Sequence, residues 1–234
     1  MIRAVFFDAG NTLVRMNYAA IAGELANHGV RATPAEVQRA EWRARVRLDE
    51  EVFARAPGAS TESRSSAAHY VRLILETLGV TDRAVVEAMA EWRRSYNAPA
   101  GLFNVADPMA EPALKLVRER GLTAGVVSNS NGTIRAILQT LGLLPYLDFA
   151  LDSTEVGVEK PHPRIFQLAV QQARVTPGEA VYVGDLYSVD VRGARAAGLD
   201  AILLDPAGLW GERDCPRAPD VLAAVRLILA DRAR

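Results

Sequence analysis

The sequence is short of several features that would point to particular classes of protein. Its 234 residues include one cysteine, Cys215, which excludes an internal disulfide and argues against a thiolate metal site. The formal net charge is −1, with 27 basic and 28 acidic residues spread along the chain, so no segment resembles a nucleic-acid-binding arm. No apolar stretch approaches the length of a membrane span. We therefore expect no nucleic-acid partner and no membrane partner.

Lysine is also scarce in this sequence. Of the 27 basic residues, only Lys115 and Lys160 are lysines. Because arginine is used almost everywhere else, each lysine is a candidate for a specific role. The chain enters a predicted strand directly, without a basic region followed by a long apolar segment, which predicts a soluble, cytoplasmic protein.

The hydrophobic residues make up 50% of the chain, which is enough for a sizeable buried core. The first apolar run, Ala4 to Phe7, is rich in β-forming residues and predicts a strand buried on both faces. Asp8 follows it immediately. In parallel α/β sheets ligands bind outside the carboxyl ends of the strands, so Asp8 is placed for chemistry. Taken alone, an acid shortly before Gly10 and Asn11 is also typical of an ordinary turn.

Two regions with different periodicity follow. Between about Arg15 and Leu102 the apolar residues recur at helical spacing, and we expect helices only. Thr33 to Glu36 combine a capping box with proline at the first helical position, which marks the start of a long helix. After Leu102, predicted helices alternate with strands, which is typical of a parallel sheet with right-handed crossovers. The strands predicted there are Leu122 to Val127, Phe149 to Leu151, Ala180 to Val183 and Ala201 to Leu204.

This alternation predicts the fold class and the domain organisation. The first strand belongs to the later sheet, because a lone strand before a helical bundle would have no partner. We therefore expect an α/β fold whose parallel-sheet core consists of residues 1–14 and 103–234. Residues 15–102 would form an inserted, all-helical cap domain over the carboxyl edge of the sheet.

Polar residues stand at three of the predicted strand ends, namely Asp8, Ser128–Asn129 and Asp185. Two carboxylates within about 4 Å repel by about 4 kcal/mol at an effective dielectric near 20, so Asp8 and Asp185 need a cation between them. Mg²⁺ suits a site that offers oxygen ligands. Lys160, in a loop before a predicted helix, would add positive charge around a phosphoryl group, and Ser128–Asn129 would add hydrogen bonds. Phosphoryl transfer depends mainly on such positioning and charge stabilisation.

Each of these residues also has an ordinary explanation. Ser128 and Asn129 are residue types preferred as helix caps. Lys160 could be solvated in its loop, while Asp185 and Asp190 could be a loop acid and a helix-start acid. The occurrence of all these features at one edge of one sheet favours the functional interpretation.

In these motifs the chain resembles hydrolases of the haloacid dehalogenase superfamily that carry a helical cap after the first strand. The four family motifs correspond to Asp8–Thr12, Val127–Asn129, Gly157–Pro163, and Val183–Asp185 with Asp190. The match covers nearly the whole chain in the expected order. The resemblance implies a Rossmann-like core and the Mg²⁺-dependent hydrolysis of a small phosphorylated substrate.

The resemblance also implies roles for the motif residues. Asp8 would be the nucleophile that forms a phosphoaspartate. Ser128 would bind the phosphate, aided by the backbone amide of Asn129. Lys160 would stabilise the charge of the nucleophile and the intermediate.

The metal site implied by the resemblance contains the chain's departure from the family pattern. Asp8, the backbone carbonyl of Gly10 and Asp185 would ligate Mg²⁺, and Asp190 would hold Lys160 or a metal-bound water. Family phosphatases generally carry a second aspartate at the position of Gly10, which protonates the leaving group and then activates water. Loss of general acid/base help costs a factor of about 10² to 10⁴.

Gly10 leaves two enzymatic interpretations open. The first is a slow or substrate-restricted phosphatase that borrows an acid from the cap, from the substrate or from a histidine. The second is a 2-haloacid dehalogenase-type hydrolase, since halide leaves unprotonated. Against the second, the family's dehalogenases work without a metal and have a motif unlike Gly184–Asp185. The histidines are His28, His69 and His162, and the cap arginines that could bind a haloacid carboxylate include Arg43, Arg45 and Arg47.

A third interpretation is a catalytically impaired phosphate-binding or regulatory protein. The retention of both Asp8 and Lys160 argues against it. Phosphonate cleavage would require a Schiff-base lysine from the cap, and no lysine precedes Lys115. We therefore predict a phosphohydrolase that acts through Asp8, as a monomer or a homodimer.

Overall fold

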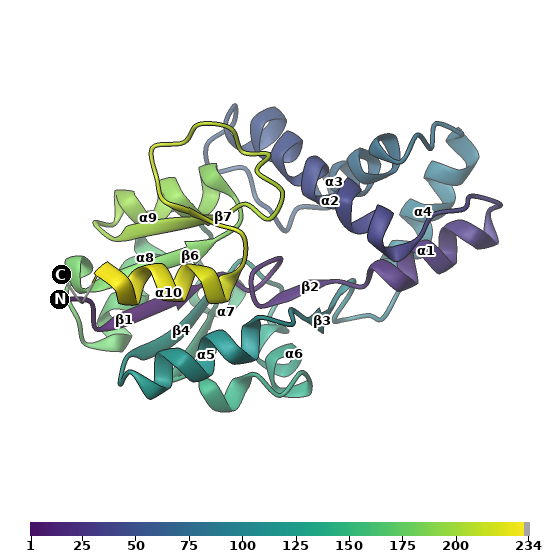
Figure 1. The fold of residues 1–234 in the computed structure, drawn as a ribbon. Helices are drawn as coiled ribbons and strands as arrows, with labels where there is room; N and C mark the ends of the chain where they lie inside the picture. The colour runs from purple at the N-terminus through teal and green to yellow at the C-terminus, as the bar shows by residue number, and fades with distance from the viewer. Residues whose placement is uncertain (232–234) are drawn as a thin grey trace.

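The computed structural model of the protein describes residues 1–231, and residues 232–234, the end of the predicted core segment, lie outside them. Within the described chain a six-stranded parallel sheet has the order β5-β4-β1-β6-β7-β8 (Figure 1). The first strand therefore lies between β4 and β6, and the predicted α/β fold is confirmed. The strands are β1 (Ala4–Phe7), β4 (Thr123–Ser128), β5 (Phe149–Asp152), β6 (Ala180–Gly184), β7 (Asp200–Leu204) and β8 (Arg217–Ala218).

The side chains of β1 alternate between two hydrophobic cores, one on each face of the sheet. Val5 and Phe7 face the core that contains α5 and α10, whereas Ala4 and Phe6 face the core that contains α8 and α9. All four residues are 0% exposed, which confirms a strand buried on both faces. The helices of this part are α5 (Ala110–Glu119), α6 (Ile134–Thr140), α7 (Ser153–Val156), α8 (Pro163–Ala173), α9 (Arg192–Ala196) and α10 (Val221–Asp231), with 3₁₀ turns at Leu144–Tyr146 and Pro177–Glu179.

Four further helices form a separate layer, called the cap below, beside the carboxyl edge of the sheet (Figure 1). They are α1 (Tyr18–Asn27), α2 (Pro34–Leu48), α3 (Arg64–Thr77) and α4 (Arg83–Ser95), and their buried side chains share a third core. The predicted capping box is present, with the Thr33 amide donating to Glu36 Oε2 at 2.7 Å. A π-helical turn, η1 (Asp49–Phe53), continues α2. Among residues 1–231, no helix has both the length and the apolar character that crossing a bilayer requires.

The expectation of helices only between about Arg15 and Leu102 is wrong at its start. β2 (Val14–Met16) pairs with β3 (Phe103–Ala106) in a two-stranded antiparallel sheet that joins the cap to the core. A strand this short shows no periodicity, and its partner lies beyond all the cap helices, so no local signal indicates the pair. The division of the chain into residues 1–14 with 103–234 and residues 15–102 stays a prediction.

Candidate active site

The carboxyl ends of neighbouring strands bring the predicted site residues together. Because β4, β1 and β6 are adjacent and parallel, Ser128, Asp8 and Asp185 meet at one edge of the sheet. Lys160 reaches them from the segment between α7 and α8, and Asp190 from a π-helical turn that follows β6. All five side chains are buried.

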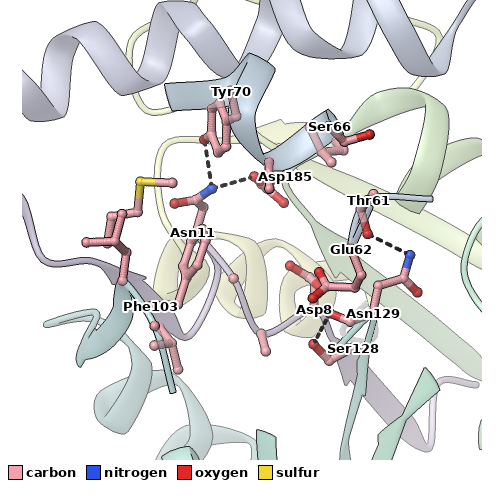
Figure 2. Close-up of a pocket in the computed structure, with 18 of the residues that line it drawn as sticks. Asp8, Asn11, Thr61, Glu62, Ser66, Tyr70, Phe103, Ser128, Asn129 and Asp185 are labelled. Atoms are coloured by element: carbon pink, nitrogen blue, oxygen red, sulfur yellow. Dashed lines mark hydrogen bonds between the residues drawn. The ribbon is translucent and has the colours of Figure 1, made fainter. Parts of the chain in front are cut away.

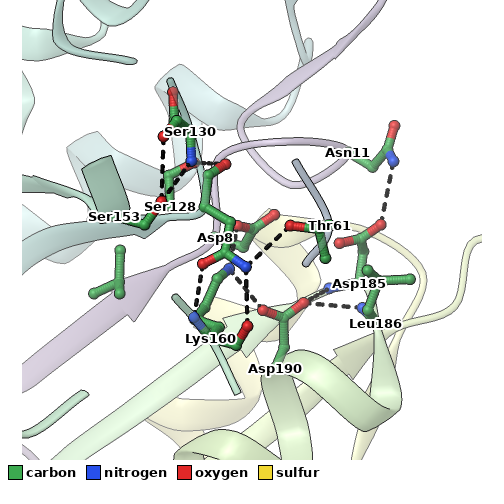
Figure 3. A network of polar contacts seen from close by, with 12 residues as sticks. Asp8, Asn11, Thr61, Ser128, Ser130, Ser153, Lys160, Asp185, Leu186 and Asp190 are labelled. Carbon is green, nitrogen blue, oxygen red and sulfur yellow. Dashed lines mark hydrogen bonds and ion pairs between the residues drawn. The ribbon is translucent and has the colours of Figure 1, made fainter. Parts of the chain in front are cut away.

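Lys160 is the centre of this group (Figure 3). Its Nζ donates to Asp8 Oδ1 at 2.5 Å, to Asp190 Oδ1 at 2.8 Å and to the Tyr182 hydroxyl at 2.9 Å, which uses all three donors of the ammonium. Burial alone would lower the pKa of Lys160, but the charges of Asp190 and Asp8 outweigh it and hold the pKa well above its ordinary value. Lys160 is therefore a buried cation and not a solvated loop lysine.

Asp190 is oriented by backbone amides. It lies in the turn η4 (Tyr187–Val191), and its Oδ2 accepts hydrogen bonds from the amides of Asp185 at 3.0 Å and Leu186 at 2.9 Å. Gly184 makes this approach possible, because a Cβ there would lie 2.5 Å from the Asp190 Cγ. The glycine at the end of β6 is therefore needed for steric reasons.

Asn129 connects two of the sequence motifs. Its Oδ1 accepts from the Lys160 amide at 2.7 Å, and its Nδ2 donates to the Lys160 carbonyl at 3.0 Å and to Thr61 Oγ1 in the cap at 3.0 Å. Ser128 Oγ donates to the Asn129 carbonyl at 3.2 Å. Neither side chain caps the next helix, α6, whose N-cap residue is Thr133.

The acidic side chains form a group that could hold a cation. Oxygens of Asp8, Asp185 and Asp190 all lie within 4.8 Å of one another. Burial raises the pKa of Asp8 to about 6 although Lys160 opposes it, and burial raises that of Asp185 well above its usual range although Arg45 opposes it. Two crowded, desolvated carboxyls with oxygen ligands only are a set that Mg²⁺ fits.

Arg45 contributes to this group from the cap as an ion-pair partner, and not as the carboxylate-binding or solvated arginine that the sequence suggests. Its Nε lies 3.4 Å from Asp185 Oδ2, and its guanidinium also pairs with Glu41 at 2.8 Å. Arg45 is therefore buried in an ion-pair network, whereas Arg43 is exposed and Arg47 pairs with acids at the cap surface. None of these three arginines lines the cavity described next.

A cavity of about 270 Å³ lies between the site residues and the cap. Figure 2 shows Glu62 of the cap close to Asp8 and Ser128. Glu62 is solvent-exposed, yet the surrounding protein and the charges of Glu159 and Asp8 raise its pKa to about 7. Arg93 lines the same cavity. The sequence does not single out either residue, because Glu62 precedes an ordinary helix start and Arg93 lies among the many arginines of the cap.

The three histidines do not replace the missing acid. His28 Nε2 lies 3.1 Å from Glu24, and His69 Nε2 lies 3.0 Å from Glu51. His162 accepts a hydrogen bond from the Arg164 amide at the start of α8. None of them lines the cavity.

Phe103 covers the position where family phosphatases carry the second aspartate. A Cβ on Gly10 would lie 3.4 Å from the Phe103 ring. This ring comes from β3, the strand that leads from the cap back into the core. The space beside Gly10 is therefore occupied by an apolar side chain.

A parallel-sheet core, a buried Asp–Lys–Asp group at its carboxyl edge and an inserted helical cap define a class of capped hydrolases. Residues 2–198 match the family model described as haloacid dehalogenase-like hydrolase, and the chain belongs to this family. The resemblance noted in the sequence is thereby confirmed.

Relatives within the family include phosphatases. The chain is 32% identical over 210 residues to haloacid dehalogenase-like hydrolase domain-containing protein 3 of Homo sapiens, which is 87% of this chain and 82% of that protein. It is 30% identical over 205 residues to glyceraldehyde 3-phosphate phosphatase of Methanopyrus kandleri, 85% and 82% of the two chains. The solved structure of a 2-haloacid dehalogenase from Pseudomonas syringae shares the fold, with a TM-score of 0.58 and 23% identity over 99% of this chain and 100% of its own.

Proposed function

We propose that the protein is a Mg²⁺-dependent phosphohydrolase that cleaves a small phosphorylated metabolite through a phosphoaspartate on Asp8. The observation that carries this proposal is the buried Asp8 carboxylate held 2.5 Å from the Lys160 ammonium at the end of the central strand. A carboxylate oxygen of Asp8 attacks phosphorus, the bond from phosphorus to the leaving oxygen breaks, and that oxygen takes up a proton. Water then hydrolyses the acyl phosphate, which releases phosphate and restores Asp8.

The remaining motif residues have supporting roles in this proposal. Lys160 balances the charge of Asp8 and of the phosphoryl oxygens, and it is fixed in place before the substrate arrives. Ser128 Oγ and the Asn129 amide donate hydrogen bonds to phosphoryl oxygens. Asp190 keeps Lys160 in position through the 2.8 Å contact.

The metal ligands in this proposal are Asp8, the Gly10 carbonyl and Asp185. Their oxygen donors and the raised pKa values of the two acids support a divalent cation at this place. When bound, Mg²⁺ offsets the repulsion between the acids and draws electron density from a phosphoryl oxygen.

Glu62 is proposed to donate the proton that the residue at position 10 cannot supply. Among the described residues, Glu62 is the only cap residue with a carboxyl group that lines the cavity. Its pKa of about 7 suits proton transfer near neutral pH. Its position on the cap side of Asp8 is where the leaving group of a bound ester would lie.

Two observations favour phosphate hydrolysis over the alternatives. Asp185 supplies a carboxylate where the family's dehalogenases, which need no metal, have a different motif, and a relative of matching length is a glyceraldehyde 3-phosphate phosphatase. The solved dehalogenase, at 23% identity, supports the fold only. A pure binding protein would have little use for the close pairing of Asp8 with Lys160.

The decisive experiment compares wild type with Asp8→Asn on phosphomonoesters, acyl phosphates and 2-haloacids, each with Mg²⁺ and with EDTA. We expect phosphate release that requires Mg²⁺ and falls by at least about 10⁴-fold in Asp8→Asn, because the nucleophile is lost. Phosphate release that survives the substitution would exclude the role of Asp8. Halide release unaffected by EDTA would instead establish the dehalogenase alternative, and binding of phosphate without any turnover would indicate a binding protein.

A further inference from the structure

The cavity contains one cation that the proposed chemistry does not use. Arg93, near the end of α4, lines the cavity together with Asp8 and Lys160. Within the described residues the Arg93 side chain donates no hydrogen bond, and no carboxylate oxygen lies within 4.0 Å of its nitrogens. By contrast, the next residue, Arg94, pairs with Glu91 on the outside of the same helix.

The Arg93 guanidinium is partly withdrawn from water, although none of its nitrogens is among the fully buried unpartnered atoms of the described chain. Arg93 is only partly exposed, and burial lowers its pKa, with Glu62 as the one acid whose charge opposes the shift. Partial withdrawal of a charge from water without a counterion costs some free energy, which a ligand anion would recover. The guanidinium therefore presents free hydrogen-bond donors and uncompensated charge to the cavity.

Glu62 does not neutralise this charge. It lies beyond ion-pair distance from Arg93, and its own pKa of about 7 means that near neutral pH it is protonated for part of the time. The Lys160 ammonium is already shared by Asp8, Asp190 and Tyr182. Arg93 is thus the cavity cation that remains available to a ligand.

The position of Arg93 indicates which part of a ligand it would meet. Asp8 and Lys160 belong to the core wall of the cavity, and Arg93 belongs to the cap wall. A phosphoryl group placed on Asp8 would direct the rest of the ester toward the cap. Apolar side chains such as Leu48, Phe53 and Val71 line this region, which strengthens an ionic contact by limiting water.

We propose that Arg93 binds a second anionic group of the substrate, a carboxylate or a second phosphate on the portion that leaves with the ester oxygen. The planar fork of arginine donors matches either group in a bidentate manner. The volume of about 270 Å³ is near the lower end of the roughly 300–1,000 Å³ typical of ligand sites, so this portion is short. This inference rests on the proposed phosphohydrolase function and adds the substrate class.

Three esters that share a two-carbon chain test the proposal: ethyl phosphate, 2-phosphoglycolate and ethylene glycol bisphosphate. They carry no second anion, a carboxylate and a second phosphate, respectively. Wild type, Arg93→Gln, Arg93→Lys and the matched control Arg94→Gln are compared by KM and kcat. The dissociation constant of each ester is also measured by calorimetry for Asp8→Asn with and without Arg93→Gln, in the presence of Mg²⁺.

For Arg93→Gln we expect KM and the dissociation constant to rise about 10- to 100-fold for the preferred anionic ester, the range of a lost charge-assisted contact. Ethyl phosphate and the Arg94→Gln variant should change less than about twofold, and Arg93→Lys should restore part of the affinity. A selective loss with 2-phosphoglycolate identifies a carboxylate, and one with the bisphosphate identifies a phosphate. Equal effects on all three esters, or none, would overturn the proposal.

The same measurements separate this inference from the proposed function. If the wild type hydrolyses none of the esters while Arg93→Gln still weakens binding of an anionic ester, the hydrolytic function fails and the anion site stands. If all esters are hydrolysed and Arg93→Gln does not discriminate among them, the function stands and the anion site fails.

Discussion

The charged side chains on the two walls of the cavity differ in whether they have partners within the protein. On the core wall, Lys160 is hydrogen-bonded to Asp8, Asp190 and Tyr182, and two amides fix the other oxygen of Asp190. On the cap wall, Glu62 and Arg93 line the cavity beyond ion-pair distance from each other. Groups that are already satisfied provide a rigid environment for charge development, whereas unsatisfied groups gain most from a ligand. The core wall thus suits chemistry and the cap wall suits selection.

The two walls are nevertheless held together by polar contacts around the cavity. Asn129 of the core donates to Thr61 of the cap, and Glu159 accepts from Ser60 in the same cap loop. These contacts fix the loop that carries Glu62. The cap residues that face the site are therefore positioned by the core motifs, although they are not part of them.

Among variants that keep the nucleophile, the largest effect is expected from Lys160→Met on the core wall. Turnover should fall by about 10³-fold, because a preorganised charge is lost. The free energy of unfolding should also fall by about 3–5 kcal/mol, because Asp8 and Asp190 would be left buried without their cation. Phosphate-release assays and urea unfolding at neutral pH measure the two quantities.

Lys115→Met is the control for this prediction, since Lys115 pairs with Glu111 on the exposed face of α5. It should leave both quantities nearly unchanged. A Lys160→Met protein that is inactive but as stable as the wild type would contradict the view that the ion pairs of the core wall stabilise the fold.

A smaller and more selective effect is expected on the cap wall from Glu62→Gln. Esters with poor leaving groups, such as alkyl phosphates, should lose about 10²-fold in kcat/KM, because the leaving oxygen is no longer protonated. Good leaving groups such as p-nitrophenolate should lose less than about 10-fold. Since the pKa of Glu62 is raised to about 7, wild-type activity on alkyl esters should decline above pH 7, and this decline should be absent in the variant.

The exposed Glu155 provides a matched control, and Glu155→Gln should behave as the wild type with every leaving group. An equal loss for good and poor leaving groups in Glu62→Gln would show that Glu62 acts through the loop structure and not as a proton donor.

The difference between the walls also explains what the sequence could predict. Asp8, Ser128 and Asp185 each lie at the carboxyl end of a recognisable strand, and the parallel order of neighbouring strands is enough to bring them together. Lys160 is conspicuous in the sequence because lysine is rare in this chain. The expected nucleophile, phosphate-binding and metal-binding roles of these residues stay predictions.

The cap wall could not be predicted in the same way. The loop before α3 has no period that gives the direction of Glu62, and the face of α4 that carries Arg93 depends on how the cap helices pack. The pairing of β2 with β3 was missed because its two strands are short and far apart in sequence. Long-range packing, rather than local pattern, decides these features.

The smallest effect on turnover is expected at the junction of the walls, from Asp49→Asn. The Asp49 carboxylate, at the start of η1 in the cap, accepts hydrogen bonds from the Ser188 amide at 3.0 Å and the Ser188 hydroxyl at 2.8 Å in the core. Burial raises its pKa from 3.8 to about 6, although the Ser188 hydrogen bonds oppose the shift. Asp49 does not line the cavity, so turnover at neutral pH should stay within about threefold of wild type, well short of the 10²-fold or more expected when an acid/base group is lost.

The effect of Asp49 should appear instead in the pH dependence of stability. Between pH 3.8 and about 6 the folded protein holds a proton on Asp49 that the unfolded chain has released. The free energy of unfolding therefore falls as the pH rises through this window, by a contribution on the order of 3 kcal/mol. The asparagine of Asp49→Asn does not titrate, so its free energy of unfolding, measured with urea from pH 4 to 6.5, should depend less steeply on pH. The exposed control Asp200→Asn should keep the wild-type slope. Identical slopes for wild type and Asp49→Asn would contradict the raised pKa, because they would mean that the Asp49 carboxylate is already ionised in the folded protein between pH 4 and 6.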